Sequence, residues 1–194
     1  MILRVLPLLI CWASLPDAFA ADAGVGPVAD PQTLTAPAAT ADAAPARRCL
    51  DAAMTAPGSN LGFCDLVISQ LSEGGGADPT TTRALSAALS NRAIAAQREG
   101  AYDAAEADLQ RALDIAGPHP DLLLNRGNLR LAQRRYAEAL IDYSEALRLS
   151  RGTLLAAHYN SAFAHRALGQ IPEAVADELR ARGHKVDIVS NQVR

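Results

Sequence analysis

Residues 125–147, NRGNLRLAQRRYAEALIDYSEAL, hold a pattern that the chain also carries before and after them. An asparagine, an alanine, an aspartate and a second alanine recur with the same two steps, of 34 and then 35 residues. A fixed period near 34 residues that fits two short helices predicts a stack of helix-turn-helix units. The recurring residues are Asn91, Asn125 and Asn160; Ala105, Ala139 and Ala174; Asp108, Asp142 and Asp177; and Ala112, Ala146 and Ala181.

The pattern resembles the tetratricopeptide repeat (TPR), which has small residues where its two helices cross and an aromatic residue early in the second helix. Tyr102 and Tyr136 take that aromatic position in the first two copies, and Ile171 replaces it in the third. The resemblance covers about half of the chain and implies an all-α, right-handed TPR superhelix, which is a helix-turn-helix solenoid. It implies three repeats within residues 78–183, at about 86–119, 120–153 and 155–183. The alanines and tyrosines then have structural roles, and the three asparagines are expected to link neighbouring repeats, the alternative being that they bind a ligand.

The resemblance also implies a concave groove lined by the first helix of each repeat. Its apolar residues with polar edges suit an extended or helical segment of a partner protein. In the alternative interpretation, Ile94, Leu131 and Phe163 are buried against the neighbouring helix. A clamp on a terminal carboxylate, as in some members of the family, is not expected because the matching positions hold no cation. The predicted groove residues are Ser90, Ile94, Gln97 and Arg98; Leu124, Asn128 and Leu131; and Tyr159, Phe163 and Arg166.

Both ends of the chain differ in composition from the repeats. Arg4, the apolar run 5–15 and Ala18-Phe19-Ala20 predict a secretory signal peptide over residues 1–20, the alternative being a retained anchor. Residues 21–45 are rich in Ala and Pro and have few large apolar side chains, which predicts a disordered linker. Residues 184–194 form a polar tail with Val186, Ile188 and Val189, which either lies against the last repeat or stays loose.

Cys49 and Cys64 are the only cysteines after the expected signal peptide. Two cysteines in an exported chain favour a structural disulfide, whereas a reactive thiol pair is the alternative. Residues 46–77 read as two short helices around a turn at 57–60, so that the disulfide would close a helical hairpin. This hairpin is predicted to be a degenerate repeat that caps the solenoid.

Nothing in the sequence indicates catalysis or nucleic-acid binding. The formal net charge is -3, and the basic residues form no stripe of the kind that nucleic acid needs. His158 and His165 are seven residues apart, about 10.5 Å along a helix, which is too far for two ligands of one metal. No phosphate-binding loop or nucleophile motif is present, so the sequence predicts neither an enzyme nor a cofactor.

Two arginines next to the recurring asparagines, Arg92 and Arg126, are expected to pair with Asp108 and Asp142. The function that the sequence favours is a periplasmic adaptor that binds a peptide or helix of another protein in its groove. Two alternatives remain: a homo-oligomeric structural module, and an accessory subunit of a cell-envelope enzyme that is bound through the convex face.

Overall fold

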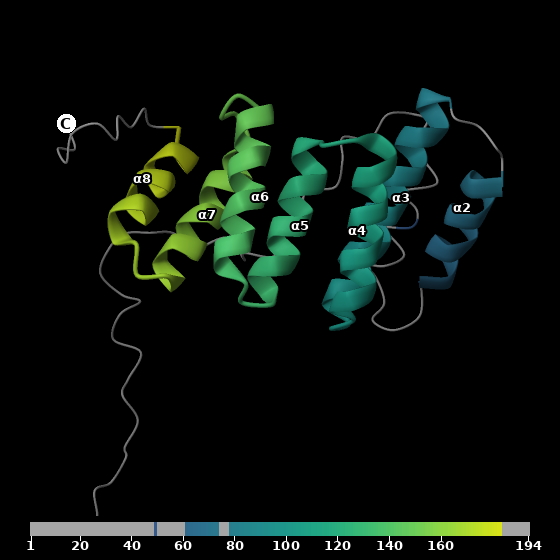
Figure 1. The fold of residues 1–194 in the computed structure, drawn as a ribbon, viewed down its shortest axis with the longest axis horizontal. Helices are drawn as coiled ribbons and strands as arrows, with labels where there is room; N and C mark the ends of the chain where they lie inside the picture. Colours follow the sequence, from purple (N-terminus) through teal and green to yellow (C-terminus); the bar gives the residue numbers. More distant parts are fainter. Residues whose placement is uncertain (1–48, 50–60, 74–77, 184–194) are drawn as a thin grey trace, which may run out of the picture.

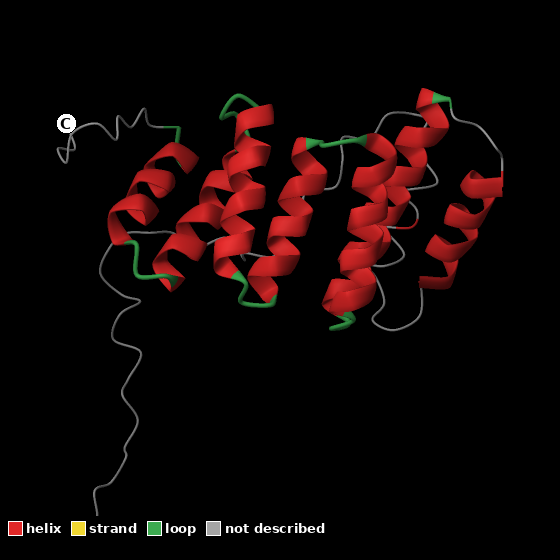
Figure 2. Ribbon diagram, viewed as in Figure 1, coloured by secondary structure: helices red, strands yellow, loops and turns green. Residues whose placement is uncertain are grey.

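The computed structural model describes Cys49 and residues 61–73 and 78–183. Within this part of the chain there are seven α-helices and no strand (Figure 2), which confirms the predicted all-α class. The predicted signal peptide (1–20), linker (21–45) and tail (184–194) lie outside the described residues, as does most of the first helix of the predicted hairpin. The helices are α2 (Leu61–Glu73), α3 (Pro79–Arg98), α4 (Tyr102–Ala116), α5 (Pro120–Ala132), α6 (Tyr136–Leu149), α7 (Leu155–Ala167) and α8 (Ile171–Ala181).

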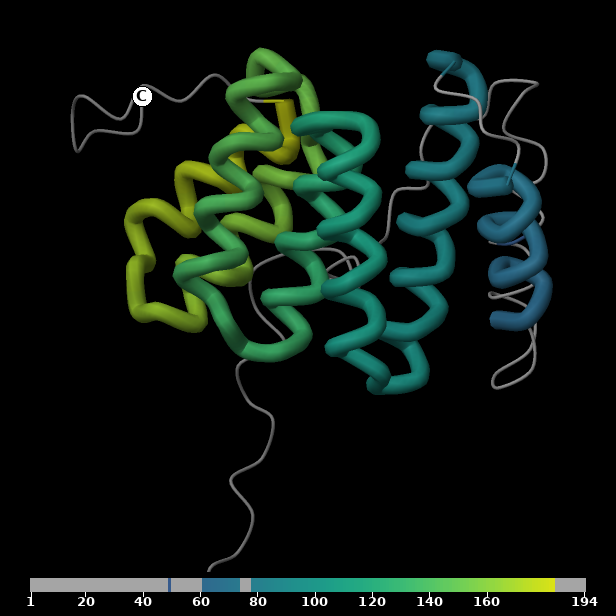
Figure 3. Tube along the Cα trace, turned by 45° about the vertical axis from the view of Figure 1, so that its right-hand side comes forward, coloured from purple at the N-terminus to yellow at the C-terminus, as the bar shows by residue number. Residues whose placement is uncertain are grey.

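The helices pack as hairpins that stand next to one another in a row (Figure 1). The pairs α3–α4, α5–α6 and α7–α8 each correspond to one copy of the sequence pattern, and α2 packs against α3. Successive pairs meet through α4 with α5 and through α6 with α7, and the first helices α3, α5 and α7 also contact one another in turn. The turned view in Figure 3 shows the same order, with α2 and α3 at one end and α7 and α8 at the other. No helix in the described ranges is long and apolar enough to cross a membrane.

Local sequence signals explain where the helices begin. Asp78 caps α3 by accepting hydrogen bonds from the backbone N–H groups of Thr80 and Thr81, and Pro79 fits the first turn because it has no N–H to satisfy. Pro120 begins α5 in the same way. Helices α3, α4 and α5 begin at Pro79, Tyr102 and Pro120.

The turn inside each helix pair needs a residue with positive φ. Gly100 and Gly169 meet this need in the first and third pairs, with φ values of 77° and 75°. In the second pair Arg134 takes this conformation, with φ 61°, which is unfavourable for a residue that has a Cβ atom. Arginine in place of glycine therefore keeps the positive φ of this turn.

Small residues let the two helices of each pair approach closely. Ala105, Ala139 and Ala174 are fully buried in the second helices of the three pairs. In the second pair Gly127 leaves room for Tyr143, since a Cβ atom at position 127 would lie 2.4 Å from Cε1 of the tyrosine ring. A side chain at position 127 would therefore displace the tyrosine ring, which is itself completely buried.

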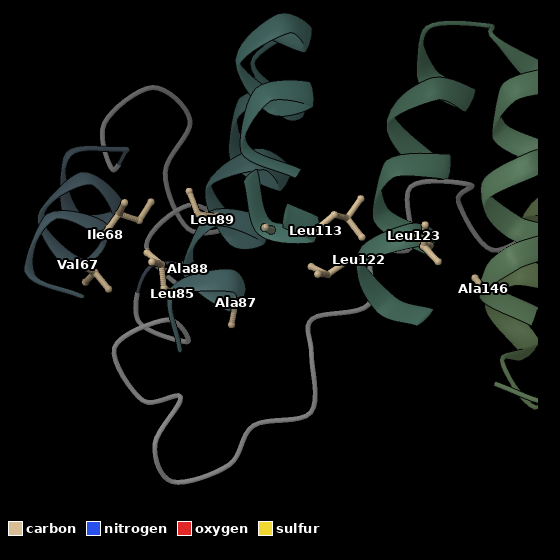
Figure 4. Packing of buried hydrophobic residues seen from close by; sticks show 11 residues of the cluster. Val67, Ile68, Leu85, Ala87, Ala88, Leu89, Leu113, Leu122, Leu123 and Ala146 are labelled. Carbon is tan, nitrogen blue, oxygen red and sulfur yellow. The ribbon is translucent and has the colours of Figure 1, made fainter. Parts of the chain in front are cut away.

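One apolar cluster runs from α2 into α6 (Figure 4). Val67 and Ile68 of α2 belong to it together with Leu89 of α3, Leu113 of α4 and Leu122 of α5. Because this cluster joins consecutive pairs, α2 is continuous with the first copy. Burial of each large side chain of this kind contributes about 1.5–3 kcal/mol to stability.

Candidate interaction surface

The structure divides the ten predicted groove residues into two groups. Six are buried, with between 0 and 7% of their surface exposed: Ser90, Ile94, Gln97, Leu124, Asn128 and Leu131. The other four keep accessible surface: Arg98, Phe163 and Arg166 are exposed and Tyr159 is half-buried. All six buried residues belong to α3 and α5, and three of the four accessible ones belong to α7.

The buried group lies where one first helix meets the next. Asn125 Nδ2 of α5 donates a hydrogen bond to Ser90 Oγ of α3 at 3.0 Å, and Asn160 Nδ2 of α7 donates to Asn128 Oδ1 of α5 at 2.6 Å. The Tyr143 hydroxyl donates to the same Asn128 oxygen at 2.9 Å. These bonds join neighbouring copies, as a structural role of Asn125 and Asn160 requires.

Apolar contacts strengthen the same junction. Leu124 and Leu131 of α5 belong to one buried cluster with Ala157 and Ala164 of α7. Ile94 and Leu131 are thus buried, as the alternative interpretation proposed, whereas Phe163 is not. The role of the ten residues in partner binding stays a prediction.

On α7 the corresponding face is accessible. Leu155, Tyr159, Phe163 and Arg166 follow one another at steps of four, four and three residues and so share one side of the helix. Leu155 is 51% and Phe163 39% exposed, so this side of the helix presents two large apolar side chains close together. Among the described helices, no later first helix packs on α7 as α5 packs on α3 and as α7 packs on α5. We call these four residues the α7 face.

In each of the first two helix pairs, α3–α4 and α5–α6, an arginine of the first helix binds a buried aspartate of the second. Arg92 binds Asp108 through Nη2 at 2.6 Å and reaches Asp65 of α2 through Nη1, also at 2.6 Å. Arg126 binds Asp142 at 2.7 Å, so both arginine–aspartate pairs predicted from the sequence are confirmed. The hydrogen bond to Asp108 raises the pKa of Arg92 above its usual value. Burial of the guanidinium lowers this pKa, but the effect is smaller.

Burial raises the pKa of Tyr143 well above its usual value, and the neighbouring negative charge of Asp142 adds to this effect. The phenol therefore stays protonated and remains the donor to Asn128. This arrangement is structural, because both groups are buried within the helix stack.

The third pair holds its aspartate differently. Asp177 is approached by His158 Nδ1 at 3.1 Å, by Arg180 Nη1 at 2.9 Å and, more distantly, by His165 Nε2 at 3.7 Å. The spacing of the two histidines along one helix did not predict this cluster. A signal was present: the third copy has Ser161 where the other copies have Arg92 and Arg126, so its aspartate needs another partner.

At the other end of the row, Cys49 and Cys64 form the predicted disulfide. Their Cα atoms are 4.8 Å apart, and both residues are completely buried. The Cys49 sulfur lies 3.8 Å from the backbone oxygen of Ala88 in α3, so the crosslink packs directly on the first copy. In the chain-entropy model, closing a loop of this length stabilises a protein by about 3 kcal/mol.

No group of three or more His, Cys, Asp and Glu side chains is placed to hold a metal ion in the part of the chain that the structure describes. No protein-family model matches the chain, and no curated protein matches it either.

Proposed function

We propose that the chain is a non-enzymatic adaptor of the tetratricopeptide type, which holds a helix or an extended segment of a partner protein. The observation that carries the proposal is the accessible α7 face. The residues of this face correspond to positions at which α3 and α5 bind the first helix of the next pair. The contact is made through Ser90 in α3 and through Asn128 in α5. A surface that is used twice inside the molecule to bind a helix is suited to bind a third one.

The repeat assignment is supported by features that recur in all three helix pairs. Each pair has a buried alanine at the helix crossing and a buried aspartate in its second helix. The pairs stand in sequence order along one row (Figure 1), and each contacts its neighbours. Recurrence of both sequence and contacts is what a solenoid built from one repeated unit requires.

We place the adaptor in the periplasm. The expected signal peptide would export the chain, and the Cys49–Cys64 disulfide is of a kind that persists in oxidising compartments. The partner segment that fits the α7 face has apolar side chains spaced to meet Leu155 and Phe163. An amphipathic helix presents such side chains at every third or fourth residue.

The test is crosslinking of the mature protein in periplasmic extract, with wild type beside Phe163→Glu. The matched control is Ile141→Glu, which changes an apolar side chain of α6 that is 66% exposed and lies outside the α7 face. A partner captured by wild type and by the control, but not by Phe163→Glu, would support the proposal. Capture that all three proteins share equally would contradict it, provided that circular dichroism shows the variants folded.

A homo-oligomeric module is the second candidate, because exposed apolar residues gather in the last helix pair. Besides Phe163, they include Leu168 between the helices, with Ile171 and Val175 on α8. Two copies that pair through this end would bury these side chains. Sedimentation over a wide concentration range separates the candidates, since a mass that doubles with concentration favours the module and a constant monomer mass favours the adaptor.

A further inference from the structure

Cys64 takes the position at which the second helices of the three pairs have their buried alanine. Ala105, Ala139 and Ala174 are each the fourth residue of such a helix, and Cys64 is the fourth residue of α2. All four residues are completely buried. An alanine at this position only permits a close contact, whereas Cys64 forms a covalent bond to Cys49.

The two sulfur atoms of this disulfide are covered by protein. Cys49 Sγ lies 3.8 Å from the backbone oxygen of Ala88 in α3, and Cys64 Sγ lies 3.4 Å from the backbone oxygen of Cys49. Neither cysteine has exposed surface. Because a thiol must approach a disulfide sulfur in order to attack it, reduction requires that the packing around α2 and α3 opens first.

Apart from the disulfide, α2 is docked mainly by two apolar side chains. Val67 and Ile68 are its other buried residues, and they belong to the cluster that contains Leu85 and Leu89 of α3 (Figure 4). Leu71 packs against the same cluster but is only partly buried. For comparison, α4 has five buried residues, so that α2 depends more than α4 does on contacts other than apolar packing.

The polar contacts of α2 with its neighbours lie at the surface. The side chain of Asp65 is 58% exposed and binds Arg92 at 2.6 Å, and Ser72 Oγ accepts a hydrogen bond from Arg111 at 3.2 Å. Exposed contacts of this kind add little to stability. The covalent bond is therefore a large part of what keeps α2 in the stack.

We infer that the Cys49–Cys64 disulfide is a redox switch at the first end of the stack. While the bond is intact, α2 stays docked and covers apolar side chains of α3. When the bond is reduced, α2 is released and Leu85 and Leu89 become accessible. The switch lies at the other end of the row from the α7 face, so it does not depend on the proposed function.

The reductant that the switch requires is a dithiol. One thiolate of the dithiol attacks a sulfur atom of the disulfide, and the other cysteine leaves as a thiolate. The second thiol of the dithiol then resolves the mixed disulfide. Two electrons and two protons pass to Cys49 and Cys64, and the dithiol ends as a disulfide.

Amide hydrogen exchange of residues 61–73 tests the inference because these amides belong to α2. In the oxidised protein they should be protected, and dithiothreitol should speed their exchange about tenfold or more while the amides of α5 to α8 stay unchanged. Cys64→Ala should have the same effect without reductant, although it supplies the alanine of the other copies. Protection of α2 that persists in Cys64→Ala, or that is already absent in the oxidised protein, would overturn the inference.

The rate of reduction tests whether docking of α2 protects the sulfur atoms. Ile68→Ala removes buried packing and should speed reduction by dithiothreitol several-fold. Leu66→Ala is the matched control, because Leu66 is 53% exposed on the same helix, and it should change the rate little. Alkylation of the freed thiols followed by mass spectrometry measures the rate. Equal rates in wild type and both variants would contradict the inference, since the disulfide would then be reached without release of α2.

Discussion

The helix pairs α5–α6 and α7–α8 carry the same sequence pattern but differ in what surrounds it. In the first of them the face of α5 is covered by α7, and Asp142 is held by two arginines. In the second the α7 face is accessible, and Asp177 is held by one arginine and two histidines. The comparison shows that the repeated residues determine the crossing within a pair, whereas the neighbouring pair determines which faces are buried.

The largest expected difference between the two pairs concerns their aspartates. Asp142 is 1% exposed and binds Arg126 at 2.7 Å and Arg130 at 2.8 Å. Asp142→Asn would leave two guanidinium groups, which cannot lose their protons, without a counter-charge, and we expect a loss of about 3 kcal/mol in the free energy of unfolding. Urea unfolding followed by circular dichroism at pH 7 measures it.

Asp177→Asn is the matched variant in the last pair. We expect a loss of only about 1 kcal/mol at pH 7, because Asp177 is less deeply buried than Asp142 and the side chain of Arg180 can turn to solvent. Equal losses for the two variants would show that the two sets of partners hold their aspartates equally strongly.

The second prediction concerns the position where the helices of each pair cross. Gly127→Ala places a Cβ atom against the Tyr143 ring and should destabilise the protein by about 2 kcal/mol. The last pair already has Ala162 and Glu178 at these positions, so Ala162→Gly should relieve no clash and should cost the helix propensity of glycine and one buried methyl group, about 1–2 kcal/mol together.

The double variant Gly127→Ala/Tyr143→Leu provides the control for this steric argument. It reproduces the combination of Ala93 and Leu109 in the first pair, so it should be more stable than the sum of its two single substitutions predicts. Strict additivity of the two substitutions would contradict a clash between position 127 and the ring.

The third prediction tests the junction between the pairs. Asn160→Ala removes the hydrogen bond to Asn128 while the Tyr143 hydroxyl still donates to the same oxygen, so we expect a loss of about 1 kcal/mol. The loss should appear in amide exchange as faster opening of α7 and α8, with α3 and α4 unchanged. Equal acceleration in all helices would mean that the pairs unfold as one unit.

The sequence was sufficient to predict the features that depend on nearby residues. The period, the pairing of Arg92 with Asp108 and the disulfide all follow from residue types at short spacings. Burial of the groove residues was not predictable in this way, because it depends on how closely one first helix approaches the next. The Asp177 cluster was missed for a related reason: His158 and His165 were compared with each other along one helix, but their shared partner lies on α8.

The smallest expected effect concerns the starts of the first helices, where α3 again differs from α7. The Asp78 side chain caps α3, whereas no side chain caps α7 at Leu154. The pKa of the Asp78 carboxyl lies well below its usual value. Hydrogen bonds with the side chains of Thr81 and Thr80 are the largest causes, and those from the backbone N–H groups of the same residues add to them. A carboxyl whose pKa is lower in the folded protein stabilises it above the pKa of the unfolded chain, about 3.9, and this contribution is lost as the pH falls further.

Asp78→Ala should therefore lower the urea midpoint at pH 7 by less than Gly127→Ala does, and its difference from wild type should shrink as the pH falls below about 4. Asp114→Ala, which removes an exposed carboxyl from the last turn of α4, is the matched control and should not lower the midpoint at pH 7, because a negative charge at a helix C-terminus is unfavourable. A difference between Asp78→Ala and wild type that is the same at pH 7 and at pH 3.5 would show that the cap acts through its geometry and not through its charge. In that case ionisation would contribute nothing to the stability of the capped start of α3. Leu154→Asn should then stabilise the start of α7 as much as Leu154→Asp does.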